Sequence, residues 1–308
     1  MADLTEGLHH VTTLGAGATR TDGFMRETLG LACVKRTVNL DEPEAYHLFY
    51  GTGEGAPGTV LSSVAFPNLA RGRAGVGEVG TVILAVMPGS LPHWRNVLEA
   101  AQLAVLGLSR VGPNNRLWFE GPEGEGYALQ VDDTHPGVEI ERGSGALIGL
   151  HGVSLRSRDP SGLASLLRAL GWELVEDVDG VSRYALSRGR GNGASAIEIE
   201  AIPDGPQAEP GAGSVHHFAF AVSDRAALER VRSELAEAGY SLSEVVSGPY
   251  FESVFLRLAD GLLVEFATNG PGFAADEPTA SLGQELILPP EHEDRRDRIE
   301  RLLEPLGR

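Results

Sequence analysis

The same order of predicted elements recurs four times along this chain of 308 residues. Each copy consists of a short apolar strand, an amphipathic helix and two or three further strands, the last of them apolar. The copies span residues 7–66, 78–133, 147–202 and 215–268. In such a βαβββ module the helix covers one face of a small curved sheet, and the other face is concave and needs a partner or a ligand. The repeat therefore predicts an α+β fold of four βαβββ modules.

The predicted helices have recognisable ends and one apolar face. In the third copy Asp159 is the expected N-cap, Pro160 occupies the first helical position and Gly171 ends the helix. The helix of the fourth copy has apolar residues at helical spacing, namely Leu228, Val231, Leu235 and Ala238. Both helices can therefore pack one side against a sheet.

We predict two domains of two modules each. The N-terminal domain covers residues 1–145, and the C-terminal domain covers residues 146–308, including the tail. The tail, residues 289–308, begins with two prolines and continues as a predicted amphipathic helix. Three apolar residues of this helix are expected to face inward: Ile299, Leu302 and Leu303. We interpret the tail as a structural clasp or as a contact in a homo-oligomer.

Composition and charge exclude several classes of protein. The single cysteine, Cys33, rules out an intramolecular disulfide and a zinc site built from several cysteines. A formal net charge of −18 disfavours binding to nucleic acid phosphates and to anionic membranes. No apolar run approaches the length of a transmembrane helix, and the first residues, MADLTEGLHH, lack the features of a signal peptide. We therefore expect a cytoplasmic protein without nucleic acid or membrane partners.

Two doubled histidines open the first strands of the first and fourth copies. The chain has nine histidines, and the pairs are His9–His10 and His216–His217. Side chains alternate across a strand, so only one histidine of each pair can face the concave side. In the fourth copy the bulky residues of 218–222 share a face with His216, and the small alanines share a face with His217. His217, and by alignment His10, are therefore predicted to point into the cup.

A glutamate closes the same cup. In the last strand of the fourth copy, GLLVEFAT, Glu265 shares a face with Leu263 and Ala267. An ionisable side chain between apolar residues is costly to bury unless a positive charge meets it. Two imidazoles and one carboxylate that converge in a cup form the facial triad of non-haem Fe(II) enzymes, which leaves coordination positions open. We therefore predict that His10, His217 and Glu265 bind one metal ion.

The other two copies provide an internal comparison. The third copy opens with LHGV, so Gly152 occupies the position of His217, although Glu200 aligns with Glu265. The second copy opens with GTVILAV and has no histidine at this position. Glu200 is therefore expected to be an exposed or paired carboxylate, and the chain is expected to hold one metal site.

Several motifs occur in an order and spacing that resemble a known superfamily. They are GLHHVT, LACVKRTVN, AYHLFYG and PGTVLS in the first copy, then VHHFAFAV, YFES and VEFAT in the fourth. With these motifs the chain resembles the vicinal oxygen chelate superfamily, the glyoxalase and extradiol dioxygenase fold, over nearly its whole length. Within it the chain is similar to ring-cleaving dioxygenases that act on hydroquinones and catechols. The resemblance implies two vicinal-oxygen-chelate domains with a cup-shaped metal site.

The resemblance also implies the cofactor and the reaction. Fe(II) is the implied ion on His10, His217 and Glu265, and Mn(II) fits the same ligands. A small aromatic substrate and O₂ are the implied partners, and both oxygen atoms enter the ring-opened product. His9 and Thr12 are implied in the pocket wall, where they contact the substrate. His216 is the candidate proton shuttle beside the metal ligand.

The chain departs from the hydroquinone-cleaving members at two positions. Those enzymes have a tyrosine ten residues before the metal glutamate and an arginine near the YFES segment. Here the two positions hold Phe255, which we place in the substrate-binding wall, and Gly248. Tyr250 or Arg257 is the expected catalytic replacement for the missing groups.

The same residues are compatible with two other functions. A glyoxalase-type isomerase or lyase uses the metal as a Lewis acid without O₂. It usually needs a fourth protein ligand, for which the segment TVLSSV is a poor source. A non-catalytic protein could instead sequester an aromatic compound or a quinone in the cup.

Overall fold

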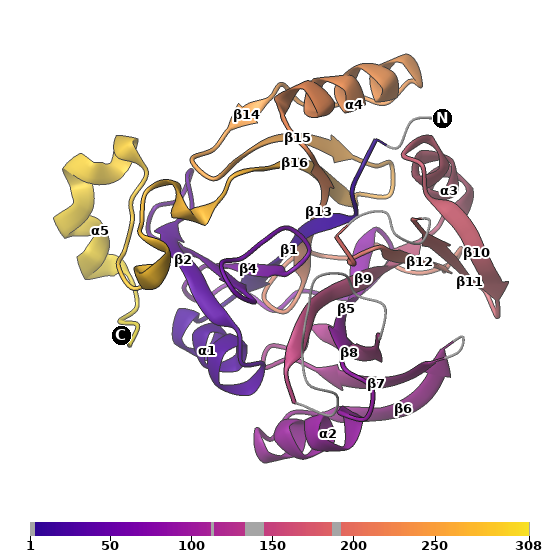
Figure 1. Cartoon of the computed structure of the whole chain (residues 1–308), viewed down its shortest axis with the longest axis horizontal. Helices are drawn as coiled ribbons and strands as arrows, with labels where there is room; N and C mark the ends of the chain where they lie inside the picture. The colour runs from indigo at the N-terminus through magenta and orange to yellow at the C-terminus, as the bar shows by residue number, and fades with distance from the viewer. Residues whose placement is uncertain (1–3, 112–113, 133–144, 187–191, 308) are drawn as a thin grey trace.

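The computed structural model describes residues 4–111, 114–132, 145–186 and 192–307. Its strands form two curled sheets of eight strands each (Figure 1). The first sheet contains the strands of the first and fourth modules, in the order β14 (Val246–Ser247), β15 (Phe251–Arg257), β16 (Leu263–Pro271), β13 (Val215–Val222), β1 (Leu8–Gly15), β4 (Val60–Ala65), β3 (Tyr46–Gly51) and β2 (Ala32–Val38). The second contains those of the second and third modules, in the order β10 (Glu173–Val178), β11 (Val181–Ala185), β12 (Ala196–Ala201), β9 (Leu147–Ser157), β5 (Glu78–Val86), β8 (Gly126–Val131), β7 (Asn114–Glu120) and β6 (Val105–Val111).

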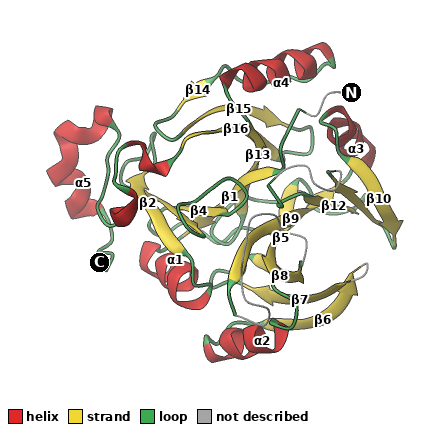
Figure 2. Cartoon of the chain, viewed as in Figure 1, coloured by secondary structure: helices red, strands yellow, loops and turns green. Residues whose placement is uncertain are grey.

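Each module contributes one helix, which lies on the outside of the sheets (Figure 2). The helices are α1 (Ala18–Gly23), continued by the π-helical segment η1 (Phe24–Thr28), α2 (Leu91–Ala100), α3 (Pro160–Ala169) and α4 (Arg225–Glu237). The predicted N-cap of α3 is confirmed, because the Asp159 carboxylate accepts hydrogen bonds from two backbone amides. None of the helices in the described part of the chain is long and apolar enough to span a membrane. The α+β class and the four βαβββ modules are confirmed.

The modules are joined in pairs through their first strands. β1 lies antiparallel to β13, and β5 lies antiparallel to β9. Each sheet therefore takes one module from either side of residue 145. The division into domains at residues 1–145 and 146–308 stays a prediction.

The two faces of the first sheet differ as strand alternation predicts. On the convex face Phe220 stacks on Phe266, with ring centroids 5.5 Å apart, and both are fully buried. Leu228, Val231 and Leu235 of α4 belong to the same core. Burial of such side chains contributes about 1.5–3 kcal/mol each. The convex face thus holds the fold together and leaves the concave face for other side chains.

The C-terminal segment covers the outer edge of the first sheet. The backbone amide of Ile287 donates to the carbonyl of Arg36 at 2.9 Å, and Leu286 forms a parallel bridge with Arg36 in β2. The segment contains the short 3₁₀ helices η2 (Phe273–Ala275), η3 (Thr279–Ser281) and η4 (Pro290–Arg295), followed by α5 (Arg296–Leu302). The edge of β2 is therefore protected by the chain itself.

The inward face of α5 is partly as predicted. Ile299 and Leu303 are buried, but Leu302 is 48% exposed, so the prediction for Leu302 is wrong. The helix ends at Leu302, and the backbone of Leu303 is extended. Helical spacing therefore applies to Leu302 but no longer determines the direction of the Leu303 side chain, which turns inward.

Candidate functional site

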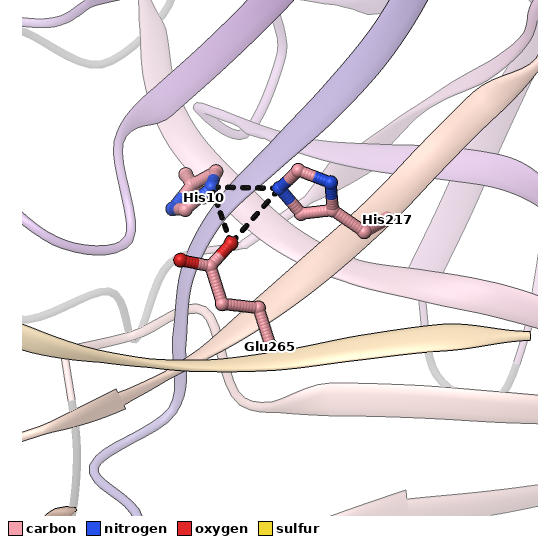
Figure 3. Close-up of side chains that lie close together, drawn as sticks. All are labelled: His10, His217 and Glu265. Carbon is pink, nitrogen blue, oxygen red and sulfur yellow. Dashed lines mark hydrogen bonds and ion pairs between the residues drawn. The ribbon is translucent and has the colours of Figure 1, made fainter. Parts of the chain in front are cut away.

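His10, His217 and Glu265 meet on the concave face of the first sheet (Figure 3). They lie on β1, β13 and β16, which are neighbours in the sheet. Nε2 of His10 is 3.3 Å and Nε2 of His217 is 2.9 Å from Oε2 of Glu265. The two Nε2 atoms are 3.2 Å apart. The sequence prediction that these three side chains converge agrees with this geometry.

The three residues are buried and have the charges that a metal site needs. Their exposed fractions are 2% for His10, 8% for His217 and 2% for Glu265. Burial favours the neutral acid of Glu265, but the two imidazoles outweigh it and hold the pKa of this carboxyl well below its usual range. Burial lowers the pKa of His217, which favours the neutral ring. Metal ligands must be deprotonated, so this donor set can hold a divalent ion.

Each doubled histidine forms the same hydrogen bond within the pair. Nδ1 of His9 lies 2.9 Å from Nδ1 of His10, and Nδ1 of His216 lies 2.8 Å from Nδ1 of His217. When Nε2 of the second histidine binds a metal ion, its Nδ1 carries the proton and donates a hydrogen bond to Nδ1 of the first. Burial lowers the pKa of His9 to about 3, so that its ring remains a neutral acceptor. The first histidine of each pair thus fixes the tautomer and orientation of the second.

A chain of hydroxyl groups leads from His217 to another histidine. Oγ1 of Thr12 lies 2.9 Å from Nε2 of His217 and 2.7 Å from Oγ of Ser62. Ser62 Oγ lies 3.3 Å from Nε2 of His47. On the opposite side of the site, Oγ of Ser253 donates to Oε1 of Glu265. The site is therefore surrounded by polar contacts that orient its ligands.

A cavity of about 220 Å³ opens in front of the three ligands. Its walls are largely apolar and aromatic, and include Phe49, Phe251 and Phe255. The ring centroid of Phe251 lies 5.3 Å from that of His10, and Phe255 presents its edge to His217 at 6.1 Å. The site thus combines an ion-binding floor with walls that suit an aromatic ring.

Comparison with known proteins identifies the family. No family model matches the chain. The chain is 34% identical, over 97% of its length and 98% of the relative's, to a protein of Bacillus subtilis named "Putative ring-cleaving dioxygenase MhqA". The chain belongs to the ring-cleaving dioxygenase family. It is also 29% identical to the chlorohydroquinone/hydroquinone 1,2-dioxygenase of Sphingobium indicum, over 98% of its own length and 97% of that protein's.

Solved structures agree with this family. A crystal structure of a "putative dioxygenase" from Bacillus subtilis superposes with a TM-score of 0.92 at 29% identity and covers 99% of both chains. Glyoxalase I from Zea mays has the same fold, with a TM-score of 0.64 at 14% identity over 85% of this chain and 92% of the other. The predicted resemblance to ring-cleaving dioxygenases is confirmed, and the chain has the predicted glyoxalase fold.

The other residues predicted for the site differ in where they lie relative to the ligands and the cavity. His9 and Thr12 are buried beside the ligands, and Phe255 lines the cavity. Tyr250 also lines it, but its hydroxyl donates to Oδ2 of Asp276 at 3.0 Å. Arg257 is exposed, does not line the cavity, and donates to the carbonyl of Gly261 at 2.8 Å.

Two further positions considered in the sequence, His216 and Gly248, add no polar side chain to the cavity. His216 is exposed and lies behind His217, on the side away from the cavity. Gly248 lines the cavity without a side chain. Neither position therefore brings a polar group of its own into the space where a ring would bind.

Three polar residues of the dioxygenase site were missed in the sequence: His47, Ser62 and Ser253. His47 alternates with Phe49 in a strand whose remaining members are apolar or aromatic, which is a detectable signal of a concave-face residue. Ser62 and Ser253 give no such signal, because a serine in a strand is common. Their contacts depend on which strands are neighbours.

The second sheet has a glutamate that corresponds to Glu265. Glu265 pairs with Ala219 between β13 and β16, and Glu198 pairs with Ser154 between β9 and β12. The expected equivalence of Glu200 with Glu265 is therefore wrong by two residues. Both glutamates of this strand lie on one face, so their alternation alone does not fix the register.

In the concave face of the second sheet, an arginine occupies the place opposite the glutamate where the first sheet could hold a metal ion. Glu198 is 3% exposed and accepts hydrogen bonds from both Nη atoms of Arg116, at 2.9 and 2.8 Å, and from Nε of Arg183 at 2.8 Å. Thr81 and Gly152 occupy the register positions of the two histidine ligands. A Cβ atom at Gly152 would lie 2.0 Å from a carbonyl of β12, so a histidine cannot be placed there without a backbone shift.

Proposed function

We propose that this member of the ring-cleaving dioxygenases opens the ring of a hydroquinone, a catechol or a related aromatic diol with Fe(II) bound to His10, His217 and Glu265. The observation that carries the proposal is the buried triad at the floor of an aromatic-walled cavity. Two imidazoles and one carboxylate are the ligands of non-haem Fe(II) oxygenases, and they also accept Mn(II).

The residues present fit such an ion. Ser253 engages Oε1 of Glu265, and Oε2 faces both imidazoles at 2.9 and 3.3 Å. An ionised, buried carboxylate needs a positive charge, and a divalent ion supplies it. When bound, Fe(II) supplies Lewis acidity toward a ring hydroxyl and electrons for O₂.

We assign a positioning role to the first histidine of each pair. His9 and His216 accept the Nδ1 proton of the ligand histidines, and this leaves both Nε2 lone pairs directed at the ion. His216 lies behind His217, so this assignment replaces the proton shuttle expected from the sequence. Oγ1 of Thr12 lies beside Nε2 of His217, the nitrogen assigned to the ion, and is itself positioned by Ser62.

The cavity favours a single substituted ring. An apolar cavity of roughly 150 Å³ is sufficient to take up benzene. The volume here, about 220 Å³, leaves room for a few substituents on one ring. Aromatic walls, with Phe251 and Phe255 beside the ligands, match the faces and edges of such a substrate. The hydroquinone substrate named for the Sphingobium relative supports the same class.

Oxygen consumption tests the proposal. The protein is reconstituted with Fe(II) under anaerobic conditions, mixed with hydroquinone or catechol, and exposed to O₂ in an oxygen electrode. We expect uptake that disappears in Glu265→Gln and in His217→Ala but persists in Glu200→Gln, which changes a partly exposed carboxylate of the second sheet.

Three other results would contradict the proposal. Tight binding of the ring without O₂ uptake would indicate a sequestering protein. Conversion of a substrate without O₂ would indicate an isomerase or lyase. Failure to bind any divalent ion after reconstitution would refute the assignment of the three ligands.

A further inference from the structure

We propose that His47 binds the second hydroxyl group of the substrate ring, and that the enzyme therefore selects uncharged rings with a hydrogen-bonding group away from the metal centre. The inference rests on the function proposed above, because it assumes that the first oxygen of the ring faces the triad. It assigns the recognition of the distal hydroxyl to β3, a strand on the opposite wall from Phe255.

Most polar groups of the cavity wall already have partners. His10, His217 and Glu265 contact one another, and Ser253 donates to Glu265. The hydroxyl of Tyr250 donates to Asp276, behind the wall. Among the described residues of the wall, two polar side chains remain, Thr37 and His47, which are cross-strand partners between β2 and β3.

The ring of His47 is held so that Nδ1 remains available. It packs on Phe49, with ring centroids 4.1 Å apart, and its Nε2 lies 3.3 Å from Oγ of Ser62. Within the residues that the structure describes, Nδ1 of His47 has no hydrogen-bond partner. An imidazole held by one nitrogen in this way presents the other to a ligand.

His47 can accept or donate at that position. Ser62 lies between His47 and Thr12, and each of the two hydroxyl groups can be the donor. If Nε2 donates to Ser62, Nδ1 accepts a hydrogen bond, and if Ser62 donates to Nε2, Nδ1 carries the proton. A hydroxyl group of a ring, which both donates and accepts, matches either tautomer.

The charge of the cavity excludes an anionic substituent. No lysine or arginine is among the described residues that line it. Burial, followed by the charges of His217 and His10, lowers the pKa of His47 to about 3, so its ring is neutral at physiological pH. Lys35 lies behind the ring of Tyr250, 4.7 Å from its centroid, but is paired with both Asp276 and Glu277. A ring carboxylate on the side away from the metal ligands would therefore lose its hydration without gaining a counter-charge.

Equilibrium binding in the absence of O₂ tests the assignment. The Fe(II)-loaded protein and the metal-free protein are titrated with hydroquinone and with phenol, which lacks the second hydroxyl. We expect the loaded wild-type protein to prefer hydroquinone by about fivefold, the effect of one net hydrogen bond. His47→Phe, which keeps the aromatic packing, should lose this preference and leave phenol affinity unchanged.

Two further variants keep the test decisive. His47→Asn, whose amide can reach part of the same position, should retain a preference, which guards against a folding defect in His47→Phe. Thr37→Val should keep the full preference; its loss there would assign the recognition to Thr37 and overturn the proposal. Equal weakening of both ligands by His47→Phe would also overturn it.

A charged ligand and O₂ uptake separate this inference from the proposed function. We expect 2,5-dihydroxybenzoate to bind the metal-free protein at least tenfold more weakly than hydroquinone, and equal or tighter binding there would refute the exclusion of anions. A hydroquinone preference that depends on His47, without O₂ uptake, would support this inference and refute the dioxygenase. O₂ uptake without a hydroquinone preference that depends on His47 would support the dioxygenase and refute this inference.

Discussion

Arg116 and Glu198 form a buried, two-pronged ion pair at the place in the second sheet that corresponds to the metal centre of the first. Both guanidinium Nη atoms contact the carboxylate, at 2.9 and 2.8 Å, and neither side chain exceeds 5% exposure. Glu198 holds the register position of Glu265, and a fixed cation of the chain meets its charge. One cup is thus neutralised internally, and the other requires an ion from outside.

Removal of one partner of this pair should destabilise the protein strongly. Arg116→Met leaves Glu198 buried with only Arg183, and we expect the free energy of unfolding to fall by about 3–5 kcal/mol. The double variant Arg116→Met/Glu198→Met should recover much of this loss, because no unpaired charge remains. Urea unfolding of the two single variants and the double variant measures the coupling. Additive losses would contradict the assignment of a paired charge.

His9 should act on metal affinity through His10. His9→Phe removes the acceptor of the Nδ1 proton, and we expect a decrease in Fe(II) affinity of about 10–100-fold. His9→Gln supplies another acceptor and should restore part of the affinity. Competition with a chelator measures both, with the surface variant His93→Gln as a control. An unchanged affinity in His9→Phe would refute the positioning role.

Cys33 should react slowly with thiol reagents in the folded protein. Burial raises its pKa from 9.0 to about 11, so the thiolate is scarce at neutral pH. We expect alkylation at pH 8 to be at least tenfold slower than in the unfolded chain, and it reports on one site because the chain has one cysteine. The raised pKa contributes stability below pH 9 that is lost as the pH rises toward 11. Equal rates in the folded and unfolded protein would contradict this prediction.

Lys35 should anchor the C-terminal segment to the first module. Its side chain is fully buried on β2 and contacts Asp276 and Glu277. Lys35→Met leaves two carboxylates without a cation, and we expect a loss of about 3–5 kcal/mol in the free energy of unfolding. Lys35→Met/Glu277→Gln should be less destabilised than the single variant. Arg298→Met, at an exposed ion pair, is the control and should lose less than about 1 kcal/mol.

Strand alternation was sufficient to predict which side chains face the first cup. In the strand 215–222 the large residues pack against the helix and the alanines share the face of His217, so one doubled histidine contains one inward ligand. The same rule selects Glu265 in β16. These predictions need only the direction of each side chain relative to its neighbours in sequence.

Features that depend on strand pairing could not be predicted from the sequence. The equivalence of Glu198 with Glu265 depends on register, and two alternating glutamates are compatible with both choices. His47 enters the site because β3 follows β4 in the sheet, which brings it close to Ser62. Which of Leu302 and Leu303 is buried depends on where α5 ends. A repeat pattern predicts modules but not which of them share a sheet.

Because the first module pairs with the fourth, the three residues of the triad cannot meet until the fourth module has been synthesised. The second sheet is built from one continuous stretch, β5 to β12. In contrast, β1 pairs with β4 on one side but finds its other partner only in β13, and His10 and His217 are 207 residues apart. A ribosome adds about 5–20 residues per second, so the hydrogen-bonding edge of β1 remains without β13 for roughly 10–40 seconds. During that interval the emerging chain has one of the three ligands and an open strand edge, the feature on which chaperones act and aggregation begins. All three residues of the triad are available to a metal ion only after Glu265 has been synthesised.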